Sequence, residues 1–170
     1  MAESANRTKK GGQDLIGGLD VRVNRNYFGR QTESFEAEID LPFLAGDNTE
    51  AKRAPFPGVF IRAPVVEQIL PTIRGEHAEE YLREDTVIAP KRDPREEPAM
   101  AVEVMATLPG RTRTLKQKVA AEALDDPIGD IIAVRQQNVF GTSFHPELTH
   151  DARIHAWWLK QVKNFTGQLK

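Results

Sequence analysis

Short apolar runs with the spacing of β-strands recur along this chain, and they constrain its fold more than any other feature. Between Leu19 and Asn26 apolar and polar residues alternate, which is the period of a half-buried strand with Leu19, Val21 and Val23 toward the core. The run Val59–Ile61 is apolar throughout and stops before Pro64, which predicts a strand buried on both faces. Further strands are predicted over residues 35–41, 86–89, 101–106, 131–134 and 139–144.

One long helix is predicted near the end of the chain, with its apolar positions at helical spacing: Ile154, Trp157, Trp158, Val162 and Phe165. Thr149 is expected to cap this helix, and Asp151 to lie in its first turn. Residues 1–10 read as the end of a helix followed by a polar turn, and residues 115–124 as a short helix. Strands mixed with a few helices predict an α/β layer fold.

Composition narrows the class of protein. A chain of 170 residues without a break in composition predicts one domain. A net charge of −2 argues against a nucleic-acid or anionic-membrane partner. No apolar run approaches the roughly 20 residues needed to cross a bilayer, and residues 1–10 lack a secretory signal, so we expect a cytoplasmic protein. The chain contains no cysteine, which excludes disulfides, thiolate metal sites and a thiol nucleophile within it.

The motif with the clearest chemistry is Phe-His-Pro-Glu-Leu-Thr at residues 144–149. Pro146 disfavours a helical backbone at His145, and alternate residues of an extended segment point the same way. His145 and Glu147 are therefore expected side by side, as the base and its orienting carboxylate in two thirds of a nucleophilic triad. Taken alone, a His-x-Glu pair is more often a surface or helix-capping arrangement.

Other readings of this region carry less weight. His150 and His155 lie nearby, but their spacing matches no zinc pattern, so no metal site is expected. Ser143 adjoins the motif, but it lies on the preceding strand and not on a strand-to-helix elbow, which argues against a serine nucleophile.

Residues 141–149 resemble the closing motif of class I glutamine amidotransferases, and in particular that of the pyridoxal 5′-phosphate synthase glutaminases. Three more segments resemble the same family in the same order: residues 11–21, 25–36 and 58–64. The resemblance implies a three-layer, flavodoxin-like α/β fold that is incomplete at its N-terminal side. One partial domain over residues 1–170 would then carry insertions near 74–100 and 109–129.

The resemblance also implies roles for individual residues. His145 would be the general base and acid, Glu147 its orienter, and Arg25, Ile61 and Arg62 would bind glutamine. Four further residues would shape that pocket or a partner-binding face: Arg30, Gln31, Glu33 and Ser34. The family holds no cofactor or metal, and its ammonia passes to a separate barrel-shaped synthase subunit, which is the expected partner.

The chain departs from the family in one respect. The family carries a catalytic cysteine in a Gly-Thr-Cys-Ala-Gly elbow, just before a helix whose end resembles Ala2–Asn6. We therefore expect an N-terminally truncated member, inactive alone and of marginal stability because sheet strands are missing. The alternatives are a non-catalytic synthase-binding module, an unstable fragment, or an unrelated α/β domain. The family assignment requires His145 and Glu147 to share a cleft with Arg25 and Arg62.

Overall fold

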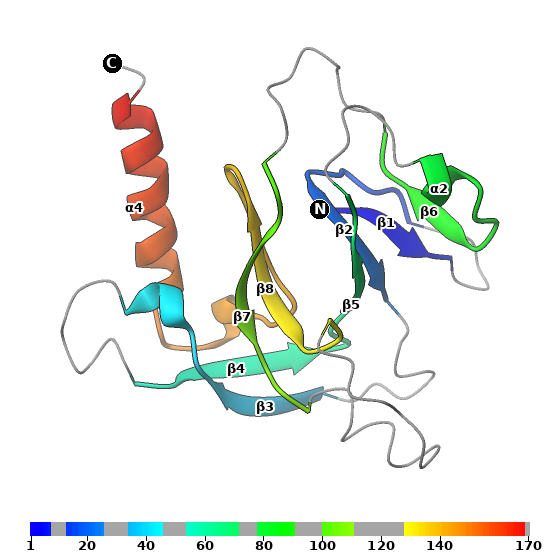
Figure 1. The fold of residues 1–170 in the computed structure, drawn as a ribbon. Helices are drawn as coiled ribbons and strands as arrows, with labels where there is room; N and C mark the ends of the chain where they lie inside the picture. The colour runs from blue at the N-terminus through cyan, green and yellow to red at the C-terminus, as the bar shows by residue number, and fades with distance from the viewer. Residues whose placement is uncertain are drawn as a thin grey trace.

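The computed structural model of the chain describes residues 1–7, 13–25, 34–45, 54–71, 78–90, 100–110 and 128–168 (Figure 1). Several predictions fall outside these ranges, namely the helix over residues 115–124 and the positions of Arg30, Gln31 and Glu33. Within them, the strands form a four-stranded, a two-stranded and a three-stranded sheet.

The four-stranded sheet has the order β5–β2–β1–β6. At its centre β1 (Ala2–Asn6) runs parallel to β2 (Leu19–Asn24). The outer strands β5 (Val65–Ile69) and β6 (Thr86–Ile88) are antiparallel to their neighbours. The strands predicted over 19–26 and 86–89 are thus confirmed, and Leu19 and Val21 are buried as expected.

Strand β1 corrects the prediction that residues 1–10 end a helix. Alanine and glutamate favour helix, but by less than ~1 kcal/mol per residue over most other residue types. Ser4 and Ala5 instead pair with β2 on one side and β6 on the other, and both are buried. Hydrogen bonding on both edges, together with burial, outweighs the local preference.

The two-stranded sheet is an antiparallel pairing of β3 (Ser34–Ile39) with β4 (Phe56–Ile61). Along β4, buried Phe56, Gly58 and Phe60 alternate with the exposed residues Pro57 and Ile61. The prediction that this run is buried on both faces is therefore wrong. A two-stranded sheet with one face on the core leaves its other face to solvent, so the burial alternates.

The three-stranded sheet has the order β7–β8–β9, with all pairs antiparallel. Its strands β7 (Glu103–Thr107), β8 (Ile131–Gln136) and β9 (Val139–Thr142) confirm the runs predicted over 101–106, 131–134 and 139–144. Gln137 has a φ of 52° in the tight turn between β8 and β9. Four consecutive residues of β8, from position 131 to 134, are buried, so this strand is covered on both faces.

The helical elements are short except for the last one. They are η1 (Pro42–Leu44), α2 (Ala78–Tyr81), η2 (Pro146–Leu148) and α4 (Arg153–Gln168). The predicted C-terminal helix is confirmed, but Asp151 precedes its first turn instead of lying in it. The Asp151 carboxylate accepts the backbone N–H of Arg153 at 3.0 Å, so Asp151, and not Thr149, caps the helix.

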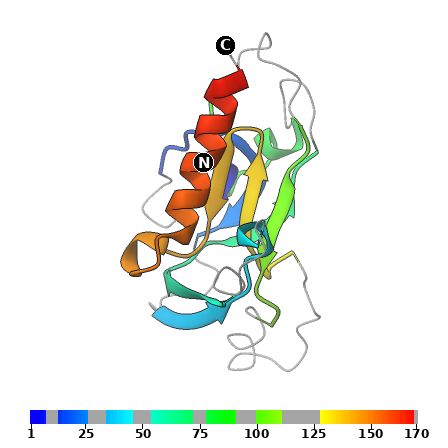
Figure 2. The same cartoon turned by 90° about the vertical axis from the view of Figure 1, so that its left-hand side faces the viewer.

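Two apolar cores lie on the two sides of the three-stranded sheet. One joins the hairpin β3–β4 to β8 and α4, through Phe56, Phe60, Ile132, Phe144 and Ile154. The other joins the four-stranded sheet to β8, through a second set of residues: Leu19, Val21, Val66, Ile131 and Val134. Figure 2 shows α4 lying across the β8–β9 side of the molecule. The mixed α/β class is confirmed, and no helix among the described residues is long and apolar enough to span a membrane.

Candidate functional site

The predicted histidine–glutamate pair forms directly after β9. His145 has an extended backbone, with φ −106° and ψ 88°, and Pro146 opens the short helix η2. The imidazole Nδ1 of His145 lies 2.8 Å from Oε1 of Glu147. The two side chains are 40% and 58% exposed, so a reactant can approach the imidazole from solvent. The expectation that these side chains lie side by side is confirmed.

The backbone around this pair is anchored to two different sheets. The N–H of Ser143 donates to the carbonyl of Ile132 at 2.9 Å, which continues the β8–β9 ladder. The N–H of His145 donates to the carbonyl of Val59 in β4 at 2.8 Å. Between them, Phe144 is buried and packs against the ring of Phe60. The imidazole is therefore presented on a backbone with little freedom to move.

The electrostatics of the pair suit a base and its orienter. A hydrogen bond from the imidazole of His145, and then a backbone hydrogen bond, lower the pKa of the Glu147 carboxyl below its usual value. Glu147 is therefore ionised at neutral pH and holds the proton of the neutral imidazole on Nδ1. The lone pair is left on Nε2, which is the arrangement that lets histidine accept a proton from a nucleophile.

The residues predicted to bind glutamine form no hydrogen bond or ion pair with the His145–Glu147 pair in the described ranges. Ile61 is the last residue of β4 and Arg62 follows the strand, two and three residues after the carbonyl that binds the His145 amide. Arg62 has a left-handed backbone, with φ 45°, and its side chain is exposed. In the parts of the chain that the structure describes, no hydrogen bond or ion pair joins Arg25 or Arg62 to the His145–Glu147 pair.

Arg25 lies at a cavity of about 450 Å³ between the four-stranded and three-stranded sheets. Its backbone N–H donates to Oδ1 of Asn6, and its guanidinium donates to Oε1 of Gln13 at 2.6 Å. Ser143 and Pro64 line the same cavity. Each of them is two residues from His145 or Arg62, but His145, Glu147 and Arg62 do not themselves line this cavity.

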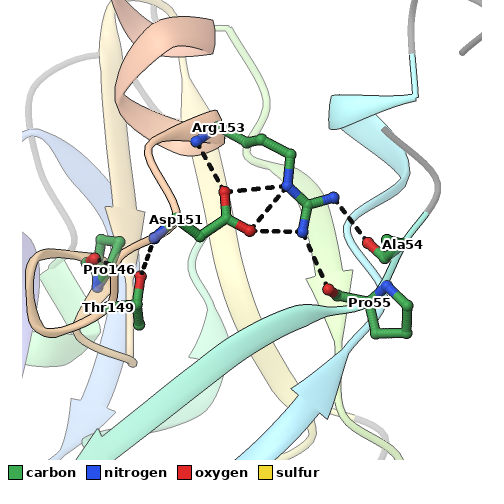
Figure 3. A network of polar contacts seen from close by, with 6 residues as sticks. All are labelled: Ala54, Pro55, Pro146, Thr149, Asp151 and Arg153. Carbon is green, nitrogen blue, oxygen red and sulfur yellow. Dashed lines mark hydrogen bonds and ion pairs between the residues drawn. The ribbon is translucent and has the colours of Figure 1, made fainter. Parts of the chain in front are cut away.

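A second polar network, which the sequence did not reveal, surrounds Arg153 at the start of α4 (Figure 3). The guanidinium of Arg153 forms an ion pair with Asp151 at 2.6 Å and donates to the carbonyls of Ala54 and Pro55 at 2.7 and 3.0 Å. It also lies 5.6 Å from the centre of the Phe56 ring. The start of α4 is thereby tied to the start of β4, with η2 between them.

The sequence indicates only one part of this network, the aspartate that caps the helix. An aspartate two residues before the first helical residue can indicate a cap. The carbonyls that Arg153 reaches lie 98 and 99 residues earlier, and nothing in their sequence marks them as acceptors. The aspartate also contributes to the electrostatics, because the hydrogen bonds from Arg153 lower the pKa of the Asp151 carboxyl. No group of three potential metal-binding side chains occurs in the described ranges.

Comparison with known proteins places this chain among the glutamine amidotransferases. A solved structure described as the crystal structure of a glutamine amidotransferase matches 91% of this chain and 52% of that chain, with a TM-score of 0.50 and 29% sequence identity. This match also confirms the predicted fold class. The chain belongs to the SNO glutamine amidotransferase family, whose model matches residues 4–95 and 97–164.

Curated relatives agree with this assignment. The chain is 34% identical to the "Probable pyridoxal 5'-phosphate synthase subunit PDX2" of Arabidopsis thaliana, over 96% of this chain and 54% of the relative. It is also 34% identical to the corresponding protein of Dictyostelium discoideum, over 96% and 52%. A third relative, the "Pyridoxal 5'-phosphate synthase subunit PdxT" of Streptomyces avermitilis, is 34% identical over 91% and 49%. The chain thus spans about half the length of these relatives.

Proposed function

We propose that this chain carries the acid–base pair of a glutaminase that releases ammonia from glutamine for pyridoxal 5′-phosphate synthesis. The observation that carries the proposal is the 2.8 Å contact between His145 Nδ1 and Glu147 Oε1, on a backbone anchored to two sheets. Family membership supports the reaction, and the names of the relatives support the pathway.

In this reaction His145 Nε2 accepts the proton of a thiol, and the thiolate attacks the side-chain amide carbon of glutamine. The protonated imidazole then gives its proton to the departing amine, which leaves as ammonia. Water, activated by the same histidine, hydrolyses the remaining thioester to glutamate. Glu147 stabilises the imidazolium during both steps. No cysteine occurs among the 170 residues, so this chain alone is predicted to release no ammonia.

We assign glutamine binding to Arg25, Ile61 and Arg62. A guanidinium fork matches the two oxygens of the substrate carboxylate, which favours Arg25 or Arg62 as its partner. Arg25 lines the 450 Å³ cavity together with Pro64, which lies two residues after Arg62, and this supports the assignment. The proposed protein partner is the synthase subunit that receives ammonia, and the proposed location is the cytoplasm.

The proposal is tested by adding a polypeptide segment that provides the cysteine nucleophile. The part of the Streptomyces avermitilis relative that this chain does not match, where the family resemblance predicts the cysteine elbow, is joined to the 170 residues, and ammonia release is assayed with the synthase. We expect turnover that falls at least ~10³-fold in the His145→Ala variant. The matched variant His150→Ala should keep full activity, because no hydrogen bond or ion pair among the described residues joins His150 to the pair. Equal activity of the two variants would refute the catalytic role of His145.

A non-catalytic module is the second candidate, and the absence of cysteine favours it. In this case the unmodified chain co-migrates with the synthase on size exclusion but releases no ammonia from glutamine. Ammonia release above background by the unmodified chain would contradict both candidates, since each assumes that the thiol lies outside these residues.

A further inference from the structure

Strand β3 is an open edge of its sheet. Among the described strands it pairs with β4 only, and Figures 1 and 2 show it at the lower margin of the ribbon. The carbonyl of Val59 in β4 accepts the amide of His145, so it points away from β3. Glu36 is the partner of Val59, and in an antiparallel ladder the two residues of such a pair direct their N–H and C=O groups away from each other. The backbone groups of Glu36 therefore point to the open side of β3.

The same geometry repeats along the strand. Because the two orientations alternate, Ser34 and Glu38 also direct their N–H and C=O groups outward. Pro57, the partner of Glu38, agrees with this assignment, since proline has no N–H to donate across the ladder. No described residue forms a backbone hydrogen bond with the outer side of β3. This side thus offers a row of backbone donors and acceptors, which is what the addition of another strand requires.

The solvent face of β3 is acidic. Glu36 and Glu38 are exposed on this face, and Asp40 continues their row just after the strand. In the ranges that the structure describes, no ion pair involves these carboxylates. Their neighbours across the ladder, Val59 and Pro57, carry no charge. A strand added to β3 would therefore have a carboxylate beside every second residue, about 7 Å apart along the strand.

The opposite face of β3 is apolar and only partly covered. Phe35 and Ala37 pack against the core but remain half-buried, and the ring of Phe35 stacks on that of Phe60 with 4.5 Å between the ring centres. Apolar side chains of an added strand would lie beside Phe35 and Ala37 and extend this packing. The sequence that fits both faces is therefore an alternation of basic and apolar residues.

We propose that β3 binds an extended, basic segment of a different protein, which adds to the two-stranded sheet as a third strand. Backbone hydrogen bonds supply the affinity, and the alternation of side chains supplies the specificity. A second copy of this chain is a poor occupant, because pairing β3 with itself would bring Glu36 and Glu38 close to the same carboxylates of the copy. The proposal does not rest on catalysis, and His145→Ala should leave the binding unchanged.

The experiment measures the binding of a fluorescein-labelled peptide that alternates lysine and valine, with lysine at both ends, by fluorescence polarisation. The 170-residue chain should bind it saturably, and added salt should weaken the binding. The matched peptide with glutamate at the lysine positions should not bind. The lysines would lie opposite Glu36 and Glu38, so their N–H groups face β3. Methylation of the lysine backbone nitrogens should therefore abolish binding, whereas methylation of the valine nitrogens should change the affinity by less than about threefold.

Variants of the chain test the same contacts from the other side. Glu36→Gln removes only a charge and should weaken binding by about threefold. Glu36→Pro also removes an outward N–H, which an edge strand tolerates, and should weaken binding by about tenfold or more. Glu103 is an exposed glutamate of β7, the edge of the three-stranded sheet, so Glu103→Gln should change the affinity by less than about twofold. If Glu36→Pro does not fold, the methylated peptides still decide the question.

Four results would overturn the proposal. The first is the absence of binding, or equal binding of the lysine and glutamate peptides. The second is an equal effect of methylation at lysine and at valine. The third is self-association of the chain without peptide that Glu36→Pro abolishes, which would make β3 a dimer contact. The fourth is the loss of binding when the chain is joined to the unmatched part of the Streptomyces avermitilis relative, since the rest of the fold would then cover β3.

Discussion

At the residue scale, two carboxylates next to η2 have different tasks. Glu147 is exposed and contacts an imidazole, whereas Asp151 is partly buried and contacts a guanidinium. Both pKa values are lowered, in each case first by a side-chain hydrogen bond. For Glu147 the consequence concerns the tautomer of His145, because a solvated pair contributes little to stability. For Asp151 the lowered pKa means that its ionised form stabilises the start of α4.

Replacing Glu147 by alanine should remove the preference of the neutral His145 imidazole for the tautomer with its proton on Nδ1. In the neutral imidazole of the native chain, we expect the proton on Nδ1. In Glu147→Ala the proton should distribute between both nitrogens. Long-range ¹H–¹⁵N correlation spectra report this directly, and the three other histidines serve as internal controls. An unchanged His145 spectrum would show that the carboxylate does not orient the ring.

Replacing Asp151 by alanine should cost about 1–3 kcal/mol at pH 7, since it removes a helix cap and a partly buried ion pair. The folded-state pKa of Asp151 lies below its ordinary value of 3.8, so its ionised form stabilises the fold above that pH. The difference from the native chain should shrink as the pH falls through the lowered pKa. Urea unfolding at pH 7 and near pH 3 measures this difference.

The variant Asp151→Asn separates the two contributions of that residue. Asparagine keeps an oxygen that can cap the Arg153 amide but carries no charge. Its cost should be smaller than that of alanine at pH 7 and should shrink as the pH falls, whereas the difference between the two variants, which reports the cap, should be nearly independent of pH. Equal costs for asparagine and alanine would mean that the ion pair, and not the cap, accounts for the effect.

At the element scale, the hairpin β3–β4 connects the predicted site to the core. Strand β4 supplies the carbonyl that binds the His145 amide, and Arg153 binds the carbonyls of the two residues just before the strand. Gly58 lies at the centre of this strand. A Cβ added there would be 3.0 Å from Cδ1 of Ile39 and 3.3 Å from the backbone oxygen of Ala37. Because a backbone atom is one of these neighbours, the strands cannot adjust by a rotamer change alone.

Gly58→Ala should therefore destabilise the chain by about 1–3 kcal/mol, the usual cost of overpacking. Gly167→Ala is the matched control, because a Cβ at that position in α4 meets no atom within 4 Å. That substitution should stabilise the helix by up to about 1 kcal/mol. Urea midpoints of the two variants should move in opposite directions. A neutral Gly58→Ala variant would show that the hairpin tolerates a wider separation.

At the scale of the whole molecule, sequence reasoning succeeded where a pattern is local. Alternation predicted β2, and helical spacing predicted α4, because each element buries one face. It failed for β1, whose burial depends on partners up to 84 residues away in β6, and for β4, whose exposed face follows from having one partner strand. In the site, the spacing of His145 and Glu147 determined their contact, whereas the reach of Arg153 depended on tertiary structure.

The sequence predicts a chain of marginal stability. Two substitutions in α4 distinguish the contribution of the packed core from that of exposed apolar surface. Ile154 and Phe165 lie in the same line of α4, but only Ile154 is buried. Ile154→Ala should cost about 2–5 kcal/mol in urea unfolding, the usual cost of a core truncation. Phe165→Gln should change the free energy of unfolding by less than about 0.5 kcal/mol, because an exposed side chain contributes little.

The same Phe165→Gln variant should reduce aggregation, measured by light scattering, and binding of the dye ANS, since it removes apolar surface that the folded chain leaves open. If Phe165→Gln instead destabilises the chain as much as Ile154→Ala does, the end of α4 is already covered within this chain. In that case the open surface, and the marginal stability attributed to it, would both be wrong.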